Sequence, residues 1–296
     1  MPGNSSEYGL SISSEVSLFL MAFSSIYTVV GSIANLLVIV TILAAKELHR
    51  RSEDQLILNL AVTDFLSLSF LSFHVYVLSQ GGLGQGYWSL YKCLYSTILF
   101  AGTNAILAIA IDRFIAVVFP MRHKRLMEGR NVGILIALSW ASALAHGATT
   151  YLSDNRKESK YFNILSITIG LLNLLVTAVV YAIIFYCTRK QVRKTSKQRR
   201  SVGVEWKGYR HSHRLWKTAI NTFVLVCLFY VTYIPVVVLV VYFWWYQERQ
   251  WKDLWNERAW ISAFIFLNSC LNPFVYSMRT KRFRKALNRK LRSYSC

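Results

Sequence analysis

Seven long apolar blocks dominate this sequence, and the short polar segments between them carry most of its charge. An apolar run of about 18 or more residues is long enough to cross the hydrocarbon core of a bilayer as a helix. Inside lipid, a helix satisfies all of its backbone polar groups within its own segment. The predicted spans cover residues 16–44, 54–79, 88–119, 131–151, 161–187, 215–246 and 258–278. The sequence therefore predicts an all-α membrane protein with a seven-transmembrane helix bundle.

The distribution of basic residues predicts how this bundle is oriented. The loops after the first, third and fifth spans, together with the C-terminal segment, contain 25 Lys and Arg residues, whereas the opposite loops contain 6. Cytoplasmic loops are enriched in Lys and Arg, so we expect an extracellular N-terminus and a cytoplasmic C-terminus in the plasma membrane. The net charge of +20 then reflects loops beside membrane lipids, and no nucleic acid is expected as a partner.

Three regions follow from this orientation. Residues 1–15 form an extracellular tail, residues 16–278 the transmembrane domain, and residues 279–296 a short amphipathic cytoplasmic helix and tail. Asn4 begins an Asn-Ser-Ser sequence and is a candidate glycosylation site. Cys296 is a candidate for palmitoylation.

One acid and one arginine stand side by side in the apolar stretch 108–117. A charged side chain in a membrane helix costs about 2.5–3.5 kcal/mol on insertion scales. We therefore expect Asp112 and Arg113 to form an ion pair that holds the protein in an off state and breaks on activation. The alternative is a pair at a helix end whose side chains reach the lipid headgroups.

A second polar group is predicted in the middle of the bundle. Asp64 is a carboxylate in the second span, and it needs polar partners inside the membrane. Asn35, Ser269 and Asn272 lie at similar depth on neighbouring spans. This cluster is either an ion site or an interhelical hydrogen-bond knot.

Motifs in nearly every span resemble the rhodopsin-like (class A) G-protein-coupled receptors, and the resemblance covers essentially the whole chain. The matching positions are Asn35, Asp64, Asp112-Arg113-Phe114, Trp140, Phe229 six residues before Pro235, Asn272-Pro273-Phe274-Val275-Tyr276, and Phe283. Among subfamilies the resemblance is loosely to melanocortin, cannabinoid and lysophospholipid receptors.

The resemblance implies a receptor, not an enzyme, that binds an extracellular ligand in the outer bundle and activates a heterotrimeric G protein. It implies a sodium ion at Asn35, Asp64, Ser269 and Asn272, although Gly102 stands where the family usually has a serine. No other cofactor or metal is expected. The switch residues that it implies are Asp112, Arg113, Phe114, Tyr181, Phe229, Tyr233, Pro235, Asn272, Pro273 and Tyr276.

Two further departures concern the switch. Tyr233 replaces the usual tryptophan before the proline of the sixth span, so its hydroxyl needs a partner. Asn173 replaces the usual proline of the fifth span, which we expect to be straighter as a result. These changes keep open a receptor that is constitutively active or silent without a ligand.

The resemblance places a ligand pocket between the outer halves of the helices. Tyr95 occupies the position of the aspartate in amine receptors, which argues against a monoamine, and Phe266 replaces the lysine that holds retinal. The ligand stays open among a peptide, a lipid and another small molecule. Lys92 and Arg258 either pair with an acidic ligand group or extend to the headgroups. The pocket residues are His74, Tyr91, Lys92, Tyr95, Ser96, Leu99, Val236, Val240, Arg258 and Ser262.

No disulfide is expected, because residues 152–160 contain no cysteine to pair with Cys93. A seven-span transporter or channel remains an alternative. It would need polar residues along a continuous path, and we expect the middle of the third and fifth spans to be nearly bare of them. A membrane enzyme would need acids or histidines gathered at one depth, where Asp64 is the one deep acid.

Overall fold

The computed structural model describes most of the predicted bundle. The described residues are 14–45, 48, 51–79, 85–154, 159–202, 216, 220, 223–224, 226–235, 237–238, 255–276 and 281–294. Within these ranges the regular structure is entirely helical, which confirms the predicted all-α class. Val236, Val240, Asn4 and Cys296 lie outside the described residues, as do the side chains of Arg258 and Tyr276.

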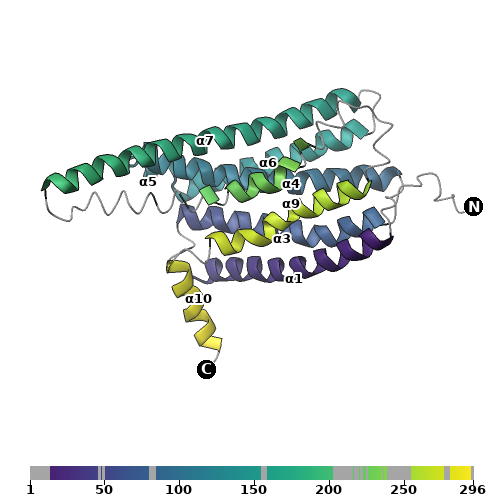
Figure 1. Ribbon diagram of the computed structural model, residues 1–296, viewed down its shortest axis with the longest axis horizontal. Helices are drawn as coiled ribbons and strands as arrows, with labels where there is room; N and C mark the ends of the chain where they lie inside the picture. The colour runs from purple at the N-terminus through teal and green to yellow at the C-terminus, as the bar shows by residue number, and fades with distance from the viewer. Residues whose placement is uncertain are drawn as a thin grey trace, which may run out of the picture.

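Most of the helices run side by side along the long axis of the molecule (Figure 1). Five are long and apolar enough to cross a membrane, and two shorter apolar helices, Val226–Pro235 and Trp260–Val275, lie at the predicted sixth and seventh spans. The helices are α1 (Ser14–Ala44), α3 (Ser52–Ser79), α4 (Gln85–Val118), α5 (His123–Leu126), α6 (Gly129–Asp154), α7 (Ser159–Val202), α9 (Trp255–Tyr276) and α10 (Lys281–Tyr294).

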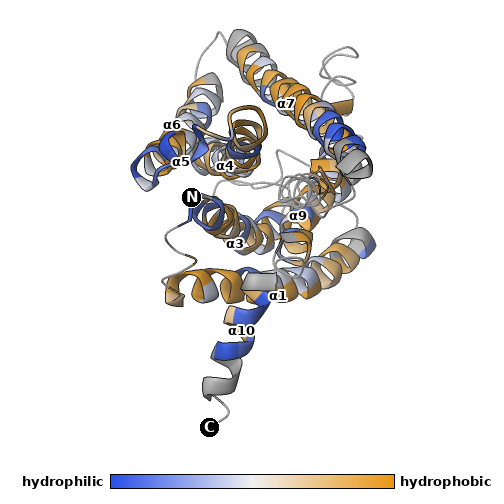
Figure 2. Ribbon diagram, turned by 90° about the vertical axis from the view of Figure 1, so that its left-hand side faces the viewer, coloured by the Kyte–Doolittle hydropathy of each residue, from blue (hydrophilic) through white to orange (hydrophobic). Residues whose placement is uncertain are grey.

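Helix α4 lies at the centre of the bundle. It packs against α3, α6 and α7, while α1 packs against α3 and α9 on the other side (Figure 2). Small side chains let the helices approach closely, as is common between membrane helices. Ala101, Ala105 and Ala110 of α4 are buried, and a Cβ on Gly147 of α6 would clash with Thr97 of α4.

Helices α6 and α7 form much of the outer surface. In the most apolar stretch of each of these two helices, only 17% of the residues are buried within the protein, compared with 56% in α4. Exposed side chains on these helices include Leu138, Leu144, Leu172 and Leu175. In a membrane protein such an apolar outer surface faces lipid tails, so it needs no protein partner.

Helix α7 is much longer than predicted. The sequence places the end of the fifth span at residue 187 and a basic loop after it, but the helix continues to Val202 and projects beyond the bundle (Figure 1). The residues after 187 are rich in Lys, Arg and Gln, which are good helix formers. The Nε2 group of Gln191 also donates a hydrogen bond of 3.0 Å to the carbonyl of Val117, which ties the extension to the end of α4.

The predicted amphipathic segment after the seventh span is helix α10. It turns away from the direction of the bundle helices and packs against α1 (Figure 1). Phe283 is buried in the main core cluster, and Ala286 and Leu287 pack beside it. Arg284 and Lys285 are exposed on the same helix, so its apolar and basic residues lie on different faces.

Candidate functional site

The predicted ion pair is present at one end of the bundle, which we call the Arg113 end. The Nη2 atom of Arg113 lies 3.1 Å from Oδ2 of Asp112, and the two side chains are 11% and 1% exposed. On its other side, Nη1 of Arg113 donates a 2.9 Å hydrogen bond to Oε1 of Glu53. The two terminal nitrogens of the guanidinium group are therefore bound to acids on two different helices.

Asp112 has two further partners. Its Oδ1 atom accepts a hydrogen bond of 3.3 Å from the hydroxyl of Ser52 and lies 3.0 Å from Nε2 of His123. Ser52 begins α3 and His123 begins α5, so three elements meet at this carboxylate. Sequence reasoning identified Asp112 and Arg113 but missed Ser52, Glu53 and His123. These three residues lie near the ends of spans, where polar residues are common and give no separate signal.

Tyr181 lies in the core near this end of α7. It is 3% exposed and belongs to the same buried cluster as Val117, Ile184 and Phe229. Its hydroxyl has no hydrogen-bond partner within the described part of the chain. An unsatisfied buried hydroxyl costs about 1–3 kcal/mol, so this tyrosine would gain from a rearrangement that brings it a partner.

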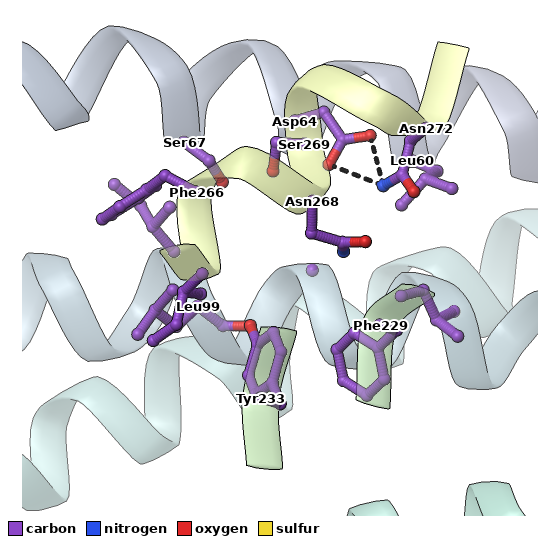
Figure 3. A pocket seen from close by; sticks show the side chains of 14 residues that line it. Leu60, Asp64, Ser67, Leu99, Phe229, Tyr233, Phe266, Asn268, Ser269 and Asn272 are labelled. Atoms are coloured by element: carbon purple, nitrogen blue, oxygen red, sulfur yellow. Dashed lines mark hydrogen bonds between the residues drawn. The ribbon is translucent and has the colours of Figure 1, made fainter. Parts of the chain in front are cut away.

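The predicted central cluster surrounds a small cavity. The Nδ2 group of Asn272 donates to both carboxylate oxygens of Asp64, at 3.2 Å and 2.9 Å. Figure 3 shows Asp64, Ser269, Asn272 and Asn268 around one space, and Tyr233 and Phe229 lie on its other side. Sequence reasoning missed Asn268. The volume open to the centre of a water molecule is about 10 Å³, close to what one water needs.

Asn35 takes a different place from the one expected. Its Nδ2 group donates to the carbonyl of Ser269 at 3.0 Å and to that of Gly31 at 2.9 Å. It does not line the cavity. Asn35 therefore joins α1 to the backbone of α9 behind the cluster, next to Pro273 inside α9.

The cavity contains oxygen atoms that suit a small hard cation. The side-chain oxygens of Asn268 and Asn272 are buried and have no hydrogen-bond partner among the described residues. Together with the Asp64 carboxylate they provide oxygen ligands, the kind that hard cations prefer. On the α4 side Gly102 provides no ligand, and a Cβ built there meets nothing within 4 Å. The chemistry fits sodium on the α3 and α9 sides of the cavity.

The two aromatic residues of the sixth span form one unit. The rings of Phe229 and Tyr233 lie 4.2 Å apart between centroids. The hydroxyl of Tyr233 donates to the carbonyl of Leu99 in α4 at 3.4 Å, so the partner that the replacement of tryptophan requires is a backbone carbonyl. Pro235 ends the described part of this apolar helix, Val226–Pro235.

The middle of α4 and α7 is more polar than the sequence suggested. The Nδ2 group of Asn173 donates to Oδ1 of Asn104 at 2.7 Å. Asn104 in turn donates to the carbonyl of Ser139 at 3.0 Å and to the hydroxyl of Ser142 at 2.9 Å. The expectation that these spans are nearly bare of polar residues is wrong at this depth. These contacts join three helices at one depth.

Four predicted pocket residues meet at the other end of the bundle, the Tyr91 end. The hydroxyl of Tyr91 hydrogen-bonds Nδ1 of His74, whose ring stacks on Tyr95 with 4.9 Å between centroids. The Tyr95 hydroxyl lies 3.4 Å from that of Ser262 in α9. Phe70 and Phe266 complete this aromatic cluster.

Three other predicted pocket residues that the structure describes have different contacts. Lys92 lies over the ring of Trp88, with 5.7 Å from its Nζ to the centroid. Ser96 donates to the carbonyl of Cys93 within its own helix at 3.1 Å. Leu99 lines the central cavity instead of the aromatic cluster.

Two other features bear on the predictions. Trp140 of α6 donates from Nε1 to Oδ1 of Asn59 in α3 at 2.9 Å, which joins two helices on either side of α4. Cys93, Cys187, Cys227 and Cys270 are free thiols. Among the described residues, no group of three or more His, Cys, Asp or Glu side chains could hold a metal ion.

Comparison with known proteins gives a match over most of the chain. Residues 34–276 match the family model described as "7 transmembrane receptor (rhodopsin family)". The chain is 25% identical to the trace amine-associated receptor 9 of Mus musculus over 86% of its length and 78% of that receptor. It is 26% identical to the CX3C chemokine receptor 1 of Rattus norvegicus, over 91% of this chain and 77% of that one. It is 26% identical to the human adenosine receptor A2a, over 68% of this chain and 55% of that one.

Proposed function

Because this chain belongs to the rhodopsin family of seven-transmembrane receptors, we propose that its Arg113 end is the part that engages the G protein. The chain is a multi-pass membrane receptor that binds an extracellular ligand and couples to a G protein, and it is not an enzyme. Because the chain belongs to a receptor family, the alternative of a seven-span transporter or channel is no longer needed.

The Arg113 end faces the cytoplasm in this proposal, and the Tyr91 end faces outward. The excess of Lys and Arg in the loops on the Arg113 side, 25 against 6, supports this orientation. It places α10 and the extension of α7 on the cytoplasmic side of the plasma membrane. It places the aromatic cluster of His74, Tyr91 and Tyr95 within reach of a ligand from outside.

The buried ion pair between Arg113 and Asp112 is the observation that carries the proposal. At 11% and 1% exposure, these side chains are shielded from solvent, and a G protein does not reach the ion pair in this state. In the open state Arg113 leaves Asp112, Tyr181 supplies a hydroxyl beside it, and a helix of the G-protein α subunit enters the resulting groove. A ligand that prefers this open state shifts the population toward it.

The ligand class follows from the Tyr91 end. Residues 85–102 contain no Asp or Glu, so the outer part of α4 offers no carboxylate to an amine. Tyr95 is instead bound to Ser262. We therefore propose a peptide, lipid or other small molecule with aromatic or apolar groups, not a monoamine and not retinal. The names of the similar receptors, which refer to trace amines, adenosine and a chemokine, point to no single ligand.

Sodium is proposed as an ion of the central cavity. Asp64, Asn268 and Asn272 provide its ligands from α3 and α9, while Gly102 provides none from α4. A bound cation would stabilise the arrangement in which these side chains converge. It would thereby favour the state of the receptor in which these side chains surround the cavity, as they do in this structure.

A ligand-independent receptor is the second candidate. The observation that favours it is the pair of changes at Tyr233 and Asn173, whose hydrogen bonds to Leu99 and Asn104 tie the sixth span and α7 to α4. Such ties shift the balance between closed and open bundles without any ligand.

The test is basal nucleotide exchange on heterotrimeric G proteins, measured with each heterotrimer class for the parent receptor, Arg113→Ala and Asp112→Asn at matched surface expression. We expect exchange by the parent, loss of it in Arg113→Ala and a gain in Asp112→Asn. Equal exchange by the parent and Arg113→Ala would contradict the assignment of Arg113. A parent that is inactive while Asp112→Asn is active identifies a silent receptor that still couples.

A further inference from the structure

The first turn of α3 contacts both members of the ion pair. Ser52 donates to Asp112, and Glu53 accepts from Arg113. The Asp112–Arg113 pair of α4 is therefore also bound by residues of α3, one of which, Glu53, is a second acid. This contact goes beyond the Asp112–Arg113 interaction that the sequence predicts.

The two acids that bind Arg113 are held very differently. Asp112 is 1% exposed and has Ser52 and His123 as additional partners, so it is fixed from three sides. Glu53 has a side chain that is 44% exposed, and within the described part of the chain Arg113 is its one ion-pair partner. A carboxylate that is partly in water can be fully hydrated again at little cost, whereas a buried one cannot.

The two acids cover the terminal nitrogens of the guanidinium group. Its Nη1 and Nη2 atoms bind Glu53 and Asp112, and its Nε atom is buried without a hydrogen-bond partner among the described residues. Because Nε is buried, an acceptor from a bound protein that approaches a terminal nitrogen competes with one of the two acids. Of the two acids, Glu53 is the easier one to displace from Arg113, because its side chain is 44% exposed and Arg113 is its one ion-pair partner among the described residues.

We propose that Glu53 is an autoinhibitory positioning residue: its carboxylate occupies the Nη1 face of Arg113 that the G protein must take. The inference rests on the proposed role of Arg113 in coupling. Activation then has two stages. Glu53 leaves first and returns to water, and Arg113 separates afterwards from Asp112, which Ser52 and His123 keep in place.

A simpler explanation for an acid at this position is the helix dipole. Acidic side chains are favoured in the first turn of a helix, and both Glu53 and Asp54 lie in the first turn of α3. That explanation predicts that loss of the Glu53 charge destabilises α3 and lowers expression and coupling together. The autoinhibitory contact predicts instead that coupling without ligand rises.

The experiment measures ligand-free nucleotide exchange by the purified full-length receptor in lipid nanodiscs with each heterotrimer class. The variants are Glu53→Gln, Glu53→Lys and Glu53→Asp, with Arg113→Ala and Asp112→Asn as the coupling controls. Glu128→Gln is the matched control, because Glu128 lies exposed near the same end and makes no ion pair with another described residue. We expect Glu53→Gln to raise exchange about two- to five-fold, as suits a partly exposed pair.

The other two variants separate position from charge. Glu53→Lys should raise exchange more than Glu53→Gln, because a cation repels Arg113, and Glu53→Asp should fall between the parent and Glu53→Gln. If the Glu53 variants match Glu128→Gln while the parent couples and Arg113→Ala does not, the inference on Glu53 is wrong and the proposed function stands. If no form, including Asp112→Asn, couples with any heterotrimer class, the proposed function fails and the inference with it.

Discussion

Asn173 of α7 donates a 2.7 Å hydrogen bond to Asn104 of α4 in the middle of the bundle, and Asn104 passes two more to α6. One amide thus joins three membrane helices. In lipid such interhelical hydrogen bonds contribute about 0.6 kcal/mol each on average, and up to about 1.7 kcal/mol. A proline at position 173 would interrupt the backbone hydrogen bonds of α7. Asn173 instead connects α7 to α4 through its side chain.

Removing both partners of this pair should cost less stability than the two single removals added together. Asn173→Leu leaves the Oδ1 atom of Asn104 buried without its donor, which costs about 1–3 kcal/mol. The double variant Asn104→Leu/Asn173→Leu has no such donor–acceptor mismatch between α4 and α7. We expect its melting temperature to be higher than the sum of the two single effects predicts, measured by thermal denaturation of purified receptor. Strictly additive effects would show that the two asparagines are not coupled.

Gly102→Ser should be tolerated and should strengthen the response to sodium. A Cβ at this position meets nothing within 4 Å, so the added side chain fits, and its hydroxyl supplies the missing ligand from α4. When sodium replaces an organic cation at constant ionic strength, we expect the melting temperature of Gly102→Ser to rise more than that of the parent receptor. Gly133→Ser is the control, because its Cβ also meets nothing within 4 Å and Gly133 does not line the cavity. An equal sodium response in both variants would contradict the cation site.

Tyr233→Phe should have a small effect and Tyr233→Ala a large one. The ring of Tyr233 packs on that of Phe229 with 4.2 Å between centroids, whereas its hydroxyl makes one long hydrogen bond of 3.4 Å. Loss of the hydroxyl should cost at most about 1 kcal/mol, and loss of the ring about 3–5 kcal/mol. Thermal denaturation of the two purified variants measures this difference. A large loss in Tyr233→Phe would mean that the hydroxyl, not the ring, holds the sixth span against α4.

Gly147→Ala should destabilise the receptor although alanine is the better helix former. The new Cβ would clash with Thr97, and its other close neighbour, the carbonyl of Cys93, is backbone and cannot rotate away. Overpacking of this kind costs about 1–3 kcal/mol. Gly133→Ala, where the same change meets no neighbour within 4 Å, should be neutral or stabilising. Surface expression and melting temperature compare the two variants, and a neutral Gly147→Ala would mean that α4 and α6 can separate freely here.

The sequence predicted the features that are expensive in a membrane. Charged groups in an apolar span, such as Asp64 and Arg113, stand out because their cost demands a role, and their partners Asn272 and Asp112 were found with them. Glu53 was missed because an acid at the start of a helix is ordinary. Its meeting with Arg113 depends on how α3 and α4 pack, which no local pattern contains.

Neutral amides were harder to interpret than charges. Asn104 and Asn268 carry no charge and belong to no motif that the sequence singled out. Asn104 nevertheless joins three helices, and Asn268 lines the central cavity. The position of Asn35 shows the reverse: similar depth predicted a shared site, but its side chain points to the backbone of α9. Depth can be estimated from sequence, whereas the direction of a side chain around its helix axis depends on the packing of the whole bundle.

The continuation of α7 to Val202 makes it a lever arm. At a rise of about 1.5 Å per residue, the part beyond residue 187 extends roughly 20 Å from the end of the predicted span. Because it is one rigid rod with the membrane part, a tilt of a few degrees in the bundle becomes a displacement of ångströms at its tip. The attachment of Gln191 to Val117 sets the fulcrum of that lever beside Arg113. A small rearrangement at the pair on α4 would thereby become a larger movement at the tip of α7, beyond the end of the bundle.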